Sequence, residues 1–170
     1  DYARRFARDI ALPPALLAWT DPLFPGEPAD ARRQREAACW MSDIGSRDHP
    51  EYRAEQAFLR ILRQPGIGLD HQARAFLGLT LALRYEAEPD APFLKPVRGL
   101  LTPEAIRRAT ILGVALRLAY TLSAGTAQLL AGTRLLPGQA LTLELAEGSG
   151  VFAGESVTRR LERLAQVMGL

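Results

Sequence analysis

The chain has 170 residues, which is enough for one domain with a buried core and a small appendage. Its hydrophobic content of 48% and charged content of 24% are ordinary for a soluble globular protein, and its formal net charge of +2 is too small to indicate a nucleic-acid-binding protein. No apolar run is long enough to span a bilayer, and the single cysteine, Cys39, excludes an internal disulfide. We therefore expect a cytoplasmic protein with no membrane or nucleic-acid partner, in which Cys39 is a small buried apolar residue.

The basic charge is almost entirely arginine, because Lys95 is the one lysine among 21 basic residues. The planar guanidinium group matches the geometry of phosphate and carboxylate oxygens better than an ammonium group does. A GC-rich coding bias explains the same composition, so the arginine content by itself does not establish a phosphate ligand.

Apolar periodicity and turn residues predict a helical first part of the chain. The predicted helices are the end of one at residues 2–9, followed by helices at 13–19, 28–44, 50–63, 71–88 and 103–123. Gly45 is expected to end the third of these, and Asp70 and Thr102 are expected to cap the last two. The chain begins at Asp1 without an initiator Met, and we interpret it as an excised C-terminal piece of a longer protein.

The period of the sequence changes after residue 131. Residues 133–136, Pro137-Gly138 and residues 140–145 predict a β-hairpin, in which Leu141, Leu143 and Leu145 alternate with Thr142 and Glu144, and residues 156–168 predict a last helix. The predicted fold is mainly α, a bundle of about six helices with a small C-terminal β-hairpin plus helix. We place the helical domain at residues 1–131 and the hairpin-plus-helix unit, packed on it, at residues 132–170.

The stretch Ser42-Asp43-Ile44-Gly45 resembles the HD-Ile-Gly signature of metal-dependent phosphohydrolases of the HD class. The resemblance implies that the helical bundle is HD-domain-like. Ser42 replaces the metal-binding histidine, and Tyr120 of Arg117-Leu118-Ala119-Tyr120 replaces the late aspartate of such sites. No histidine precedes His49, so the upstream ligand is missing as well, and Asp43 alone remains. A hydroxyl does not replace a neutral imidazole as a ligand of a transition metal, so we predict no metal site and no stoichiometric transition metal.

Other polar residues near these degenerate positions allow two interpretations. His49, Glu55 and Glu86 could converge with Asp43 into an oxygen-rich site for Mg²⁺ or Ca²⁺. Alternatively, the carboxylates pair with arginines, namely Arg47, Arg53 and Arg84, and this second interpretation is the one we favour.

Residues 37–45, residues 49–55 (His49-Pro50-x-Tyr52-Arg53-x-Glu55) and residues 109–120 together resemble the C-terminal region of the exopolyphosphatase / guanosine pentaphosphate phosphatase (Ppx/GppA) family. The hairpin and the closing helix resemble the tail of that family. The resemblance implies an N-terminal actin-like catalytic region in the same polypeptide, which carries the cleavage chemistry and its Mg²⁺.

We therefore expect a non-catalytic accessory domain of an exopolyphosphatase-like hydrolase that helps to bind polyphosphate, to form a homodimer, or both. No cofactor is expected in this segment, and the segment alone is expected to hydrolyse neither polyphosphate nor guanosine pentaphosphate. Arg47, Arg53 and Arg84 are the polyphosphate-binding candidates. The alternatives are a stand-alone HD-type metal-dependent phosphohydrolase, which the loss at Ser42 and Tyr120 disfavours, and an arginine-rich nucleic-acid module, which the small net charge disfavours.

Overall fold

A computed structural model describes Arg4, residues 7–64 and residues 68–170 of the chain. Half of the helix end that the sequence predicts at residues 2–9 lies outside the described residues, and the described residues 7–9 are not helical. None of the described helices combines the length and the apolar character needed to cross a bilayer.

The described residues form eight α-helices, two short 3₁₀ turns and one two-stranded sheet, so the predicted mainly α fold with a small hairpin is confirmed. The elements are α1 (Leu12–Thr20), η2 (Asp21–Leu23), α2 (Ala29–Met41), α3 (Arg53–Arg63), α4 (His71–Arg84), η3 (Pro92–Leu94), α5 (Lys95–Arg98), α6 (Pro103–Ser123), α7 (Ala127–Ala131), β1 (Thr133–Leu136), β2 (Thr142–Leu145) and α8 (Glu155–Met168). The predictions did not include α5 and α7, which are one or two turns long.

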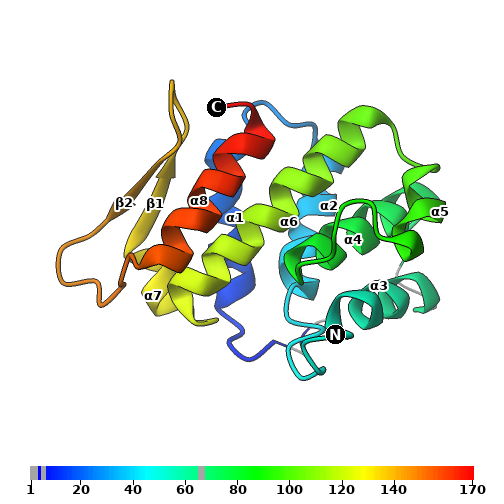
Figure 1. Ribbon diagram of the computed structural model, residues 1–170, viewed down its shortest axis with the longest axis horizontal. Coiled ribbons are helices and arrows are strands. Elements are labelled where there is room, and N and C mark those ends of the chain that lie inside the picture. Colours follow the sequence, from blue (N-terminus) through cyan, green and yellow to red (C-terminus); the bar gives the residue numbers. More distant parts are fainter. Residues whose placement is uncertain (1–3, 5–6, 65–67) are drawn as a thin grey trace.

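Helix α6 is the central element, and it runs across the middle of the molecule in Figure 1. Its start follows the predicted signals, since the Thr102 side chain accepts a hydrogen bond from the backbone N–H of Ala105 and Pro103 occupies the first turn. One side of α6 packs against α4 and another against α8, and α3 packs on the far side of α4. The lone cysteine lies in this core as predicted, and burial raises the pKa of the Cys39 thiol to about 12.

The connection between α2 and α3 differs from the prediction. Helix α2 ends at Met41, and turns fill residues 42–47, because the Tyr85 hydroxyl donates to the Ser42 carbonyl and accepts from the Gly45 N–H, both at 2.9 Å. Gly45 does not end the helix, since its role is to let the Tyr85 ring approach: a Cβ there would lie 3.0 Å from the ring. Helix α3 starts three residues later than predicted, which leaves Tyr52 exposed instead of on the inner face.

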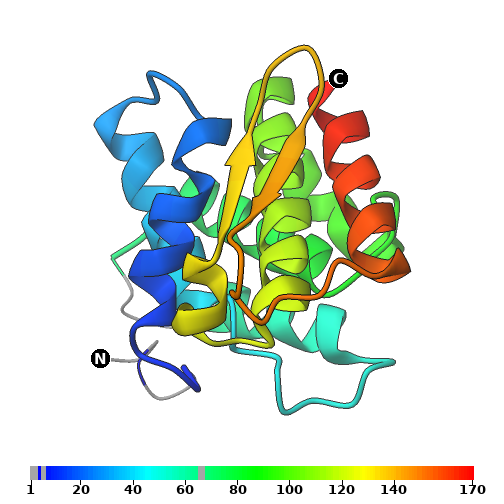
Figure 2. The same ribbon diagram turned by 90° about the vertical axis from the view of Figure 1, so that its left-hand side faces the viewer.

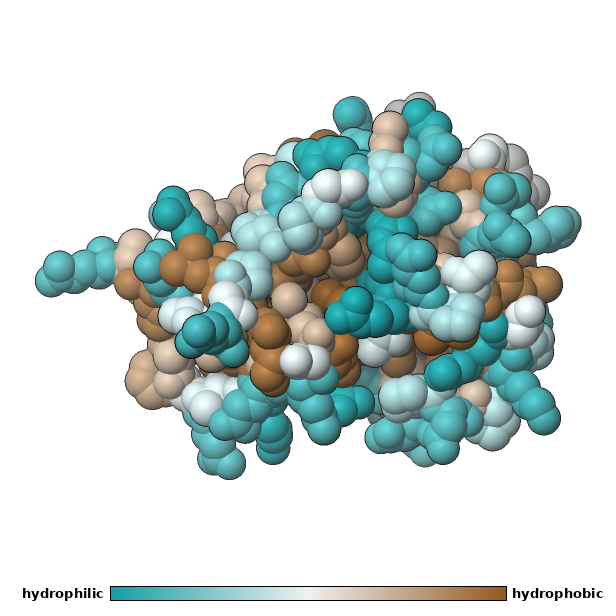
Figure 3. Space-filling view, turned by 90° about the horizontal axis from the view of Figure 1, so that it is seen from above, coloured by the Kyte–Doolittle hydropathy of each residue, from teal (hydrophilic) through white to brown (hydrophobic). Residues whose placement is uncertain are grey.

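The hairpin closes one end of the molecule, as Figure 2 shows. Its strands pair antiparallel with Thr133 opposite Leu145 and Leu136 opposite Thr142. The Trp19 indole donates to the Thr133 hydroxyl at 2.8 Å, which fixes β1 against α1, and the chain then returns as α8 along α6. Seen from above in Figure 3, apolar side chains gather toward this hairpin end, whereas polar side chains cover most of the other end.

Candidate anion-binding site

Asp43, the one HD-type ligand kept in the sequence, is paired with an arginine. Its side chain is only 4% exposed, and the Arg8 Nε lies 2.9 Å from Oδ2, where the Arg8 backbone N–H also donates at 3.1 Å. The hydrogen bond with Asp43 raises the pKa of Arg8. A guanidinium group therefore supplies the positive charge that this buried carboxylate requires.

Ser42 and Tyr120 meet beside Asp43, as their shared relation to the HD pattern predicts. The Ser42 hydroxyl lies 2.6 Å from the Cys39 carbonyl and 2.9 Å from the Tyr120 hydroxyl. Because a hydroxyl carries one proton, Ser42 donates to the carbonyl and Tyr120 donates to Ser42. Burial is the main reason that the pKa of Tyr120 is raised, so the phenol is neutral at physiological pH.

These residues do not fit a divalent metal. The Asp43 carboxylate is engaged by Arg8, the two neighbouring hydroxyls are engaged with each other, and no imidazole is present. Within the part of the chain that the structure describes, no three His, Cys, Asp or Glu side chains are grouped as a metal would need.

The remaining polar candidates separate into two groups. His49 is exposed, with its ring centroid 5.9 Å from that of Tyr52, and Arg47 is exposed in the turn after Asp43. Glu55 and Glu86 both line a pocket between α3 and the end of α4. The structure thus brings together Glu55 and Glu86 but places neither His49 nor Arg47 in the lining of that pocket.

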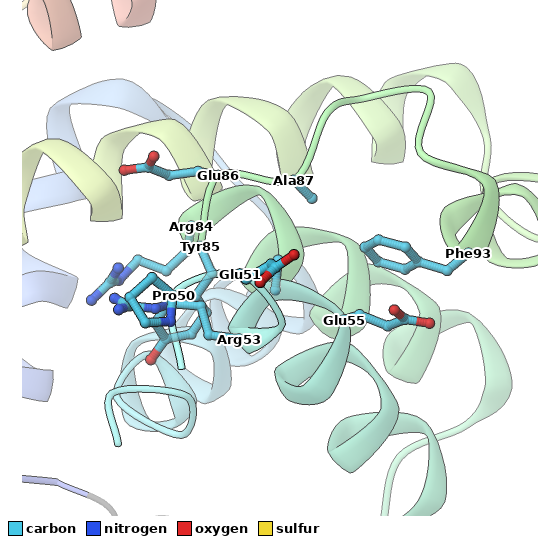
Figure 4. Close-up of a pocket in the computed structure, with 10 residues that line it drawn as sticks. Pro50, Glu51, Arg53, Glu55, Arg84, Tyr85, Glu86, Ala87 and Phe93 are labelled. Carbon is cyan, nitrogen blue, oxygen red and sulfur yellow. The ribbon is translucent and has the colours of Figure 1, made fainter. Parts of the chain in front are cut away.

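This pocket, which we call the arginine pocket, has a volume of about 550 Å³. It contains two of the three arginine candidates, Arg53 from the start of α3 and Arg84 from the last turn of α4. In Figure 4 the nitrogen ends of both side chains lie toward the same side of the pocket, whereas the Glu55 carboxylate points toward Phe93 on the other side. The two arginines are therefore placed to act on one ligand.

Arg84 is a buried charge without a counter-ion. It is 9% exposed, and among the described residues it makes no hydrogen bond and no ion pair. Its guanidinium carbon lies 3.8 Å from the centroid of the Tyr120 ring and 4.4 Å from that of Tyr85. The two rings offer cation–π contacts to the charge, and among the described residues the buried Nε of Arg84 has no acceptor.

Arg35 shows what a satisfied buried arginine looks like in the same protein. It is 1% exposed, and its nitrogens donate to Glu27, to Asp21, to the Leu17 carbonyl and to the Thr20 hydroxyl. Buried charges are normally paired in this way because desolvation is costly. Among the described residues, Arg84 lacks the acceptors that the protein provides for Arg35.

Arg53 has a related environment. It is half-buried, and its Nε is buried without a hydrogen-bond partner among the described residues. Burial raises the pKa of the Tyr85 phenol, and the positive charges of Arg84 and, less strongly, Arg53 oppose that rise. Arg53 and Arg84 therefore present two guanidinium groups around one buried tyrosine.

Comparison with known families identifies the chain. The model of the exopolyphosphatase C-terminal domain family matches residues 8–170. The chain belongs to this family. A search of curated proteins finds no match. The family hit agrees with the resemblance carried by residues 37–55 and 109–120, and it covers the arginine pocket and the hairpin alike.

Two contributors to the site of this exopolyphosphatase C-terminal domain were missed from the sequence. Tyr85 was not singled out because nothing local shows that its hydroxyl reaches back to residues 42 and 45. Arg8 was not singled out because it lies 35 residues before Asp43 in the sequence. A buried carboxylate without a metal needs a positively charged partner. This requirement is the signal that could have led to Arg8.

Proposed function

We propose that this chain is the accessory, non-catalytic domain of an exopolyphosphatase and that its arginine pocket binds the polyphosphate chain. The observation that carries the proposal is the buried side chain of Arg84, which lines the arginine pocket and has no counter-ion among the described residues. A phosphate oxygen would supply the acceptor that the protein itself does not provide. Guanidinium groups bind such oxygens with short, charge-assisted hydrogen bonds.

The carboxylates of the arginine pocket do not cancel this charge. Glu51, Glu55 and Glu86 are exposed, and water and salt screen their fields, whereas the Arg84 side chain is desolvated. A buried cation therefore attracts an anion in the pocket more strongly than the exposed carboxylates repel it. A polyphosphate chain also continues beyond the pocket, so further surface arginines add weak, salt-dependent contacts.

Cleavage belongs, in this proposal, to the N-terminal actin-like region that the family resemblance implies, and the present domain holds the substrate for it. We further propose that the chain works in the cytoplasm. The stand-alone HD-type phosphohydrolase has no support in the site, because a serine, a tyrosine and an arginine-bound aspartate occupy the HD positions.

The test is titration of the 170-residue chain with long-chain polyphosphate by isothermal calorimetry, comparing the wild type with Arg84→Met and Arg53→Met. Arg33→Met is the matched control, since Arg33 is an exposed arginine on α2 paired only with exposed Asp30 among the described residues. Loss of a charged hydrogen-bonding group costs about 1.5–3 kcal/mol, so Arg84→Met should weaken binding roughly 10- to 100-fold. Arg33→Met should change it little.

The thermal midpoint of each variant separates an effect on folding from an effect on binding. Among the described residues Arg84 has no ion pair to lose, but methionine gives up the cation–π contacts with Tyr120 and Tyr85, so the affinities are compared at a temperature at which every variant is folded. Equal affinities of Arg84→Met and Arg33→Met for polyphosphate would contradict the proposed role of the arginine pocket.

A further inference from the structure

A second arginine-rich pocket adjoins the first. It has a volume of about 340 Å³ and lies between the loop after α4, helix α6 and helix α8. Its basic residues are Arg117 from α6 and three residues of α8, namely Arg159, Arg160 and Arg163. Glu86 and Ala87 line both pockets, so the two cavities share a wall. We call this second cavity the α6–α8 pocket.

The carboxylate of Glu86 is the acceptor for the two best-placed arginines of this pocket. Glu86 Oε1 lies 2.5 Å from Arg117 Nη2 and 3.2 Å from Arg160 Nη2. The Nε atoms of both arginines are buried and have no hydrogen-bond partner in the described part of the chain. One carboxylate thus faces two guanidinium groups and leaves part of their donor capacity unused.

The positive charge in the α6–α8 pocket exceeds what Glu86 neutralises. Burial lowers the pKa of Arg117, and the nearby charges of Arg160 and Arg159 lower it further, although Glu86 opposes them. Glu88 lines the same pocket but is exposed and forms no ion pair among the described residues. A second anion would therefore find a favourable field here once the Glu86 carboxylate moves aside.

The backbone of Glu86 has a left-handed conformation at the end of α4. It has a φ of 74°, and the bonds from Glu86 N to Leu83 O and from Ala87 N to Ala82 O form the Schellman pattern that ends α4. Glycine is the usual residue at this left-handed position, and any other side chain there costs about 1 kcal/mol. The Glu86 side chain nevertheless remains 54% exposed, so it is free to swing toward solvent.

We propose that Arg117 and Arg160, flanked by Arg159 and Arg163, form a second binding site for a condensed phosphate chain. The Glu86 carboxylate occupies this site in the free protein and is displaced when the phosphate chain binds. The ligand class rests on the function proposed above. The site and the displaced carboxylate rest on the contacts within the α6–α8 pocket. Because both pockets share Glu86, its displacement joins them into one track for a ligand longer than a single pocket.

The experiment compares Glu86→Gln with Glu88→Gln in the 170-residue chain, with long-chain polyphosphate as the probe. Both variants remove one negative charge from the same pocket wall, but only Glu86 forms ion pairs with Arg117 and Arg160. Glutamine keeps the size of the side chain and the same backbone strain. Because exposed ion pairs contribute up to about 1 kcal/mol, Glu86→Gln should raise the polyphosphate affinity about fivefold, and Glu88→Gln should raise it less than twofold.

Two additional measurements localise the effect. In an Arg117→Gln/Arg160→Gln background, Glu86→Gln should change the affinity no more than Glu88→Gln does, because the carboxylate then blocks no guanidinium group and only its screened charge is removed. In the Glu86→Gln chain, the Nε–Hε NMR signals of Arg117 and Arg160 should shift on addition of polyphosphate. Equal effects of Glu86→Gln and Glu88→Gln, or unchanged Nε–Hε signals, would overturn the proposal.

Failure of the two proposals can be told apart. If Arg84→Met abolishes polyphosphate binding while Glu86→Gln has no effect, the proposed role of the arginine pocket is supported and the second binding site is contradicted. If the protein binds no polyphosphate, but inorganic phosphate shifts the Nε–Hε signals of Arg117 and Arg160 in Glu86→Gln, the anion site blocked by Glu86 is supported and polyphosphate as its ligand is contradicted.

Discussion

Gly113 is the point at which helix α6 comes closest to α4, and replacing it tests whether this contact positions the arginine pocket. A Cβ at position 113 would lie 2.7 Å from the Thr80 carbonyl oxygen and 2.8 Å from the Leu83 Cβ. Ordinary contacts begin near 3.4 Å, so the helices would have to separate by roughly 0.6–0.7 Å. The atoms in the way are backbone or the stem of a side chain, so no flexible end can move aside.

We expect Gly113→Ala to lower the stability of the chain. The overpacking penalty is about 1–3 kcal/mol, and its upper range applies because both helices are central in the core. Alanine returns about 1 kcal/mol through its higher helix propensity. The net loss is therefore about 1–2 kcal/mol, which corresponds to a fall in thermal midpoint of roughly 3–6 °C for a domain of this size.

The assay is thermal unfolding followed by circular dichroism, combined with polyphosphate titration. Gly99→Ala is the matched control, because Gly99 has helical φ and ψ angles and its nearest contact would be an ordinary 3.6 Å. Gly113→Ala should also weaken polyphosphate binding, since the backbone nitrogen of Arg84 lies 3.3 Å from the added Cβ. A thermal midpoint of Gly113→Ala at or above that of the wild type would refute the close α4–α6 contact.

Two further predictions concern ion pairs. Arg8→Ala should lower the free energy of unfolding in urea by about 1–2 kcal/mol, because it leaves the buried Asp43 carboxylate unpaired, while Arg8 itself is half-exposed. Adding Asp43→Asn should restore most of this loss. No recovery in the double variant would contradict the pairing. Burial alone would raise the pKa of Asp21, but hydrogen bonds and charges from Arg35 and Arg32 lower it below 3.8. The ionised Asp21 therefore stabilises the fold above about pH 4, and the stability difference between wild type and Asp21→Asn should be present at pH 6 and shrink toward pH 3; a difference that grows on acidification would contradict this.

The elements that could be predicted from the sequence are those set by local signals. Helix α4 begins after Asp70, whose side chain accepts from the Ala73 N–H at 2.7 Å, and α6 begins after Thr102. The hairpin followed from alternation between residues 133 and 145, because a period of two reports a strand with one buried face. In each case the residues that determine the element lie within or beside it.

The parts that could not be predicted depend on contacts between distant residues. The end of α2 is set by the Tyr85 hydroxyl, which binds a turn 40 residues earlier. The predicted helix at 71–88 stops at Arg84 because Glu86 takes a left-handed conformation, which the sequence pattern does not favour at a glutamate. Similarly, the sequence shows that Arg84 is an arginine but not that it lacks a carboxylate partner, since that depends on everything packed around it.

If the proposed function holds, an HD-like arrangement has changed from holding a cation to attracting an anion. Where a metal would require carboxylate and imidazole ligands, Ser42 and Tyr120 are neutral and Asp43 is neutralised by Arg8. The Tyr120 ring faces Arg84 at 3.8 Å and Arg8 at 5.9 Å, so two guanidinium groups flank it where a metal ligand would stand. A metal attracts phosphate only while it is bound, whereas these cations are part of the chain. In the proposed function, the cations that attract the anion are therefore built into the fold, and the strength of that attraction depends on how well Arg84 is kept from water and from carboxylates.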